Sequence, residues 1–132
     1  MATTKLLHPE VEASVRQLKG ALLDVMVSVG ADPRRPQTIH RRFQLDRVLC
    51  WKVSRIEKAT AAEEALNYLP GAEAFRIYLD AFEREGADKD AVQRSRDAVR
   101  TLSEKLERHV GDRTTLELVL DGAARKGEQL LV

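Results

Sequence analysis

The chain has 132 residues, of which 43% are hydrophobic, 33% are charged and only 5% are aromatic, and its formal net charge is +1. This length suffices for one domain with its own core, and the single cysteine, Cys50, excludes an internal disulfide or a cysteine-based metal site and suits a reducing cytoplasm. No stretch approaches the ~20 apolar residues of a membrane span, and the first twelve residues lack the apolar core of a signal peptide.

The first predicted element is a long amphipathic helix over residues 9–29. Its apolar residues recur at spacings of three and four, which places them in one stripe along the helix. The stripe consists of Val11, Val15, Leu18, Leu22, Val25 or Met26, and Val29. Gly30 follows the stripe and is expected to end the helix. The stripe packs either within the domain, which is the favoured interpretation, or against a second copy of the chain.

Two short helices joined by a tight turn are predicted at residues 36–44 and 47–58. Pro33 and Pro36 prevent the first helix from continuing through the preceding loop. Asp46 is placed to cap the second helix by accepting backbone N–H bonds. The apolar residues of the second helix that are expected to face inward are Leu49, Val53 and Ile56, with Cys50 alongside.

The rest of the chain is also predicted to be helical. Helices are expected over residues 61–69, with Thr60 as a cap, and then over 72–85, 89–110 and 113–126. Long β-branched runs are absent, and Gly and Pro lie at segment edges, so the sequence predicts an all-α helical bundle. The C-terminal helices are amphipathic.

The net charge hides a separation along the chain. Residues 34–58 hold eight lysines and arginines and two acids, a local charge of +6, whereas the remainder carries −5. A basic segment on an acidic body suits a local contact with a polyanion. We therefore expect a functional region within residues 1–60 and a helical scaffold or dimerisation region over 61–132, unless both form one continuous domain. The alternative is that the basic segment is only a solvated, arginine-rich helix pair.

Residues 36–55 resemble the helix-turn-helix of bacterial transcriptional regulators. In that pattern, apolar residues occupy five places of a twenty-residue window, because two helices joined by a tight turn share one small core. Counted from Pro36, these places hold Ile39, Phe43, Leu45, Cys50 and Val53. The place that is usually a small residue is His40, and the place that is usually glycine is Gln44, which leaves open a longer or differently shaped turn.

The resemblance implies that the helix at 47–58 is a recognition helix in the major groove of double-stranded DNA. Arginine can read guanine through a bidentate contact, whereas other cations more often meet phosphates. The resemblance also implies a homodimer that matches symmetric half-sites. The residues expected to reach base edges or flank them are Arg47, Val48, Trp51, Lys52, Arg55 and Lys58, and those expected to hold the phosphate backbone are Arg34, Arg35, Arg41 and Arg42.

Other functions remain open at this stage. The basic face could instead bind an acidic partner protein, which would make the chain an interaction module, or a pocket between residues 66 and 106 could bind a small molecule. Trp51 is either a DNA contact or a core anchor. The sequence has no phosphate-binding glycine loop, nucleophile elbow or metal-ligand spacing, so we expect no enzyme and no catalytic, cofactor or metal site. His8 and His109 are far from His40 along the chain.

Overall fold

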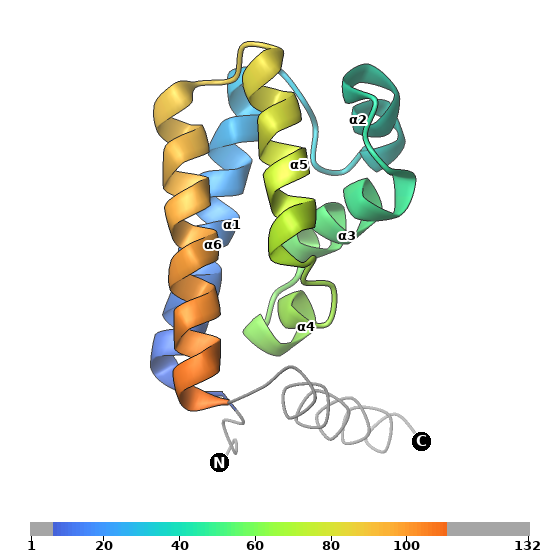
Figure 1. Ribbon diagram of the computed structural model, residues 1–132. Helices are drawn as coiled ribbons and strands as arrows, with labels where there is room; N and C mark the ends of the chain where they lie inside the picture. The colour runs from blue at the N-terminus through green and yellow to red at the C-terminus, as the bar shows by residue number, and fades with distance from the viewer. Residues whose placement is uncertain (1–6, 111–132) are drawn as a thin grey trace, which may run out of the picture.

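The computed structural model describes residues 7–110, and within that range all regular structure is helical (Figure 1). This confirms the all-α prediction. The helix predicted over residues 113–126 lies outside the described residues. The six helices are α1 (Pro9–Ser28), α2 (Pro36–Phe43), α3 (Arg47–Lys58), α4 (Ala62–Leu66), α5 (Ala72–Arg84) and α6 (Lys89–His109).

The two longest helices, α1 and α6, run antiparallel and side by side along most of their length (Figure 1). The apolar stripe predicted on α1 faces the hydrophobic core of the domain, since Val11, Val15 and Leu18 are at most 3% exposed. The stripe is therefore used within the chain, as favoured, and is not free to receive a second copy. Gly30, after the end of α1, adopts a positive φ of 69°, in agreement with its predicted role at the helix end.

Helices α2 and α3 form a compact pair joined by the turn at residues 44–46. Ile39 and Phe43 of α2 and Leu45 of the turn are buried together with the inner face of α3. The Asp46 carboxylate accepts a hydrogen bond from the Leu49 backbone N–H, 2.9 Å away, which confirms the predicted cap. All five apolar places of the twenty-residue window are thus in the core.

The turn itself uses a left-handed residue without glycine. Gln44 has φ 53° and ψ 44°, the conformation for which glycine is usually required. His40 and Leu45 lock the turn from both sides: the Leu45 N–H donates to the His40 carbonyl, and His40 Nδ1 donates to the Leu45 carbonyl. The turn is therefore tight, and the residues that depart from the usual pattern take part in closing it.

Replacing Gln44 by glycine is expected to raise the free energy of unfolding by about 1 kcal/mol, because glycine has no Cβ to strain in this conformation. Urea denaturation measures the change. The matched control is Gln37→Gly, at an exposed position inside α2, which should lower stability by roughly 0.5–1 kcal/mol. A loss of stability in both variants would contradict the expectation.

The helix predicted over residues 61–69 is present, but its predicted cap and length are wrong. Helix α4 covers only Ala62–Leu66, and its N-cap is Ala61 with no side-chain hydrogen bond, so Thr60 does not cap it. Instead the Thr60 N–H donates to the Glu64 carboxylate at 3.3 Å. The helix stops early because the chain turns toward Pro70, which is buried and has no N–H for a helix.

A single hydrophobic cluster runs through the described chain, from Leu7 to Leu102, and takes residues from both sides of residue 60. Aromatic rings join the α2–α3 pair to the bundle: Phe43 of α2 stacks on Phe82 of α5 with ring centroids 4.1 Å apart. Tyr78 extends the same aromatic group, with its ring 4.8 Å from Phe82. The α2–α3 pair is therefore held on the bundle by core packing.

Candidate nucleic-acid interface

The two faces of α3 differ sharply in exposure. Its inner residues Cys50, Val53 and Ile56 are each 1% exposed, whereas Val48 and Trp51 on the outer face are 55% and 46% exposed. Arg47 and Lys58 are also exposed, and Lys52 and Arg55 are partly buried. The predicted contact residues of α3 thus share one solvent-facing surface, which we call the α3 outer face (Arg47, Val48, Trp51, Lys52, Arg55, Lys58).

Trp51 lies at the surface, where its ring contacts Tyr68. Its ring meets the Tyr68 ring at 90° with centroids 5.3 Å apart. The Arg55 guanidinium carbon lies 5.9 Å from the Trp51 ring centroid and 5.2 Å from that of Tyr68, and an Arg55 nitrogen is 3.5 Å from the Tyr68 hydroxyl. These contacts hold Arg55 and orient Trp51 without burying it. Of the two roles considered for Trp51, a DNA contact or a core anchor, the exposure of its indole ring argues against the core anchor.

The six cations of α2 and α3 all lack an acidic partner among the described residues. Within residues 7–110, no ion pair involves Arg41, Arg42, Arg47, Lys52, Arg55 or Lys58. On α5 and α6, four of the six arginines are paired within the fold, and these are Arg76, Arg94, Arg96 and Arg100. The positive charge of the α2–α3 pair is therefore uncompensated locally, which favours attraction of an external anion.

The loop before α2 places two further predicted contacts less favourably. The Arg34 guanidinium pairs with the Asp32 carboxylate at 3.2 and 3.3 Å, and Arg35 approaches the same carboxylate at 4.0 Å. An anion would have to compete with Asp32 for both arginines. Because Asp32 is only two and three residues away in the sequence, its competition for Arg34 and Arg35 could have been predicted from the sequence.

The same loop is tied to α3 by a buried hydroxyl. Ser54 Oγ, in a residue 3% exposed, donates to the Pro33 carbonyl at 2.6 Å. The bond fixes the arginine-bearing loop against the back of α3. Sequence patterns alone would not reveal it, because a serine on the inner side of a helix carries no signal of its partner.

Replacing Ser54 by alanine is expected to lower the free energy of unfolding by about 1–2 kcal/mol, since the partly buried Pro33 carbonyl loses its donor. Thermal or urea denaturation measures the change. Ser103→Ala, at an exposed position on α6, is the control and should change stability by less than about 0.5 kcal/mol. Equal effects in the two variants would mean that the Ser54 bond does not hold the loop.

An open hollow of about 560 Å³ lies between the start of α2 and the outer face of α3. Pro36 and Gln37 line it from α2, and Arg47, Val48 and Trp51 line it from α3. No acidic residue occupies the first turn of α2. The hollow is therefore a mostly apolar surface with a cation at its edge, and nothing in its lining repels a negatively charged ligand.

Cys50 lies on the opposite side of α3, in the core, as expected from its inward position. Burial is the main reason that the pKa of its thiol is raised, to about 11, and the Asp46 carboxylate adds to this effect. The thiol therefore stays protonated at neutral pH and functions as a small apolar side chain.

The contact of Tyr68 with Trp51 and Arg55 was not predicted from the sequence. The pattern of residues in α4 and the turn after it does not indicate that this segment contacts α3.

In the part of the chain that the structure describes, no helix is both long and apolar enough to cross a bilayer. Comparison with known proteins gave no match to a family model, to a curated protein or to a solved structure.

Proposed function

We propose that this protein binds double-stranded DNA through the α3 outer face. The observation that carries the proposal is the set of six cations on α2 and α3 that have no acidic partner among the described residues, next to a helix whose other face is fully buried. Affinity for DNA comes mainly from cations that neutralise phosphates and release counterions. A helix pair that exposes such cations on a rigid edge has the chemistry that the DNA backbone requires.

The parts of the surface would have distinct roles. Helix α3 would lie in a major groove, where Arg47 near its first turn would meet base edges and Val48 would contact a thymine methyl group. Arg41 and Arg42 at the end of α2, both exposed, would bind phosphates. Because Arg55 is held by Trp51 and Tyr68, it would add a fixed charge beside the groove.

A role in transcription regulation is part of the same proposal, because bacterial regulators use helix pairs of the kind that residues 36–55 resemble. A homodimer on symmetric half-sites would need a surface other than the α1 stripe, since that stripe is buried. Leu23 and Val27 of α1, which are 39% and 64% exposed, are the apolar residues of α1 that remain available.

The direct test titrates duplex DNA of mixed sequence with the protein and follows anisotropy of labelled DNA at several salt concentrations. We expect affinity to fall steeply and linearly on logarithmic axes as salt rises. Trp51 is the only tryptophan, so its fluorescence should also change on binding and become less accessible to acrylamide. Absence of binding at low salt would end the proposal.

The second candidate function is an adaptor whose basic face binds an acidic partner protein. The observation that favours it is the apolar hollow beside Trp51 and Val48, because protein interfaces are centred on such apolar anchors. Copurification of a partner that survives nuclease treatment, together with no salt-dependent binding to duplex DNA, would favour the adaptor over the DNA-binding protein.

A further inference from the structure

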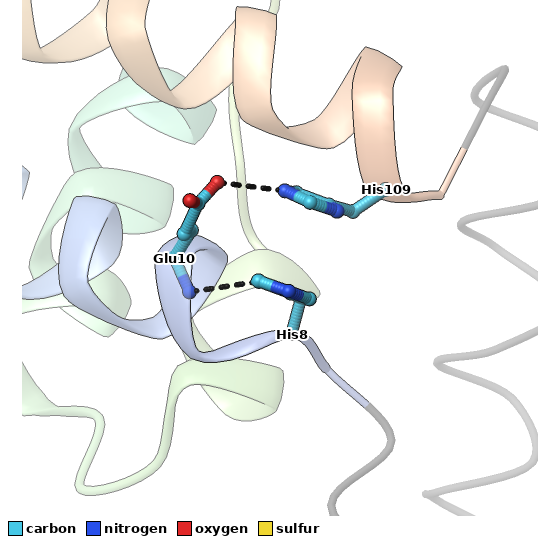
Figure 2. A group of neighbouring side chains, drawn as sticks. All are labelled: His8, Glu10 and His109. Atoms are coloured by element: carbon cyan, nitrogen blue, oxygen red, sulfur yellow. Dashed lines mark hydrogen bonds and ion pairs between the residues drawn. The ribbon is translucent and has the colours of Figure 1, made fainter.

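The ends of α1 and α6 bring together two histidines that are far apart in the chain. His8 precedes α1 and His109 ends α6, and their rings stack with centroids 3.8 Å apart and an interplanar angle of 6° (Figure 2). Glu10, in the first turn of α1, places a carboxylate oxygen 2.8 Å from His109 Nε2. The antiparallel pairing of α1 and α6 creates this cluster.

The hydrogen bonds of the cluster involve both of its histidines. His8 Nδ1 accepts the Glu10 backbone N–H at 3.1 Å, and His109 Nε2 donates to the Glu10 carboxylate at 2.8 Å (Figure 2). A metal ion needs the lone pair of one nitrogen on each ring, so its binding would displace a proton or one of these bonds. The cluster thus brings two imidazoles and a carboxylate together, which are metal-ligand chemistry.

We propose that His8, Glu10 and His109 form a binding site for a divalent transition metal ion of the zinc class. One ligand atom from each residue lies within 4.8 Å of the other two. A four-coordinate zinc ion with bonds of about 2.0–2.2 Å needs donors roughly 3.3 Å apart, so the ligand atoms must move closer together. Each imidazole also binds a metal in the plane of its ring, so the two stacked rings must turn out of their parallel arrangement for their nitrogens to converge on one ion. Two imidazoles and one carboxylate suit zinc and nickel better than magnesium or calcium, which prefer oxygen.

The surroundings of the site allow a metal ion to bind, although the positive charge of Lys105 opposes it. Glu10 and His8 are exposed and His109 is 19% exposed, so an ion can enter from solvent. Lys105 Nζ lies 3.3 Å from the Glu10 carboxylate and competes with a cation for it. With three protein ligands, a fourth position stays open to water or to a ligand. The ion would join the two ends of the described chain and so stabilise the α1–α6 pairing.

The test measures Zn²⁺ binding to the full chain, free of any histidine tag, by titration calorimetry at neutral pH. We expect one ion per chain. His109→Gln, and His8→Asn, which preserves a capping side chain, should each lower affinity by more than the roughly 10–100-fold that loss of an outer-shell partner costs. Lys105→Met should raise affinity. His40→Gln, which removes the chain's third histidine, is the matched control and should leave binding unchanged.

A second measurement does not depend on how the variants fold. Co²⁺ added to the wild-type chain should give the intense visible bands of a four-coordinate complex, and Zn²⁺ should abolish them by displacement. The melting temperature should also rise with Zn²⁺ concentration. No uptake of Zn²⁺, or uptake that His40→Gln removes and His109→Gln does not, would overturn the proposal. In that case the cluster is only a polar clasp between two helix ends.

Discussion

Replacing Arg47 and Lys52 together by alanine is expected to weaken binding to duplex DNA by roughly tenfold or more and to reduce the salt slope by about two. Both side chains are on the α3 outer face, and neither has an acidic partner among the described residues. Each cation that meets a phosphate releases about one counterion, so the change in slope reports how many phosphates the variant no longer neutralises. Anisotropy titrations at three or more salt concentrations give both quantities.

The matched control removes the same charge from another helix. Arg100 and Arg108 are exposed on α6, and their double replacement by alanine lowers the net charge by the same two units. This control should leave the salt slope nearly unchanged, because α6 lies on the other side of α5 from the α2–α3 pair (Figure 1). Equal reductions of affinity in the two double variants would show that binding follows total charge and not the α3 outer face.

Replacing Glu57 by glutamine is expected to raise the free energy of unfolding at pH 8 by about 1–3 kcal/mol. Glu57 is partly buried on α3, and its Oε1 is buried with no hydrogen-bond partner. Burial raises the pKa of this carboxyl from 4.5 to about 7, although the charge of Lys19 lowers it. An uncharged amide of the same shape avoids the penalty of an ionised buried group.

The pH dependence follows from the direction of this shift. The folded state holds the Glu57 proton up to about pH 7, whereas the unfolded chain releases it near 4.5. The folded state therefore binds more protons between these values, and the contribution of Glu57 to stability falls as pH rises from 4.5 to 7 and is constant above. Urea denaturation across this range should show the fall in the wild type and its reduction in Glu57→Gln.

Glu104, exposed on α6, supplies the control for that experiment. Glu104→Gln should leave the pH dependence of stability as in the wild type. If Glu57→Gln is less stable than the wild type at pH 8, the carboxylate has a favourable partner in solution and the burial argument fails.

The faces of the helices could be predicted from the sequence because periodicity reports which side of a helix avoids water. The five apolar places from Ile39 to Val53 are all buried, and the outer residues Val48 and Trp51 are exposed. Periodicity does not report which element covers a face. The stack of Phe82 on Phe43 and the contact of Tyr68 with Trp51 therefore could not be predicted.

Polar details escaped prediction for a related reason. His40 and Gln44 depart from the usual pattern in residue type, and in the structure His40 bonds to the Leu45 carbonyl while Gln44 adopts a left-handed conformation. The meeting of His8 with His109 depends on the relative lengths of α1 and α6 and on their antiparallel direction. Neither quantity can be obtained from a local pattern.

The stack of Phe43 on Phe82 has a thermodynamic consequence for any partner of α3. Because α2 is packed onto α5 through core aromatic rings, the α3 outer face is preorganised and a partner would meet it as a rigid body. Association then avoids most of the entropy that ordering a loose segment would consume. The heat capacity change on binding should therefore be small and match the interface area alone, without the large negative value that accompanies coupled folding.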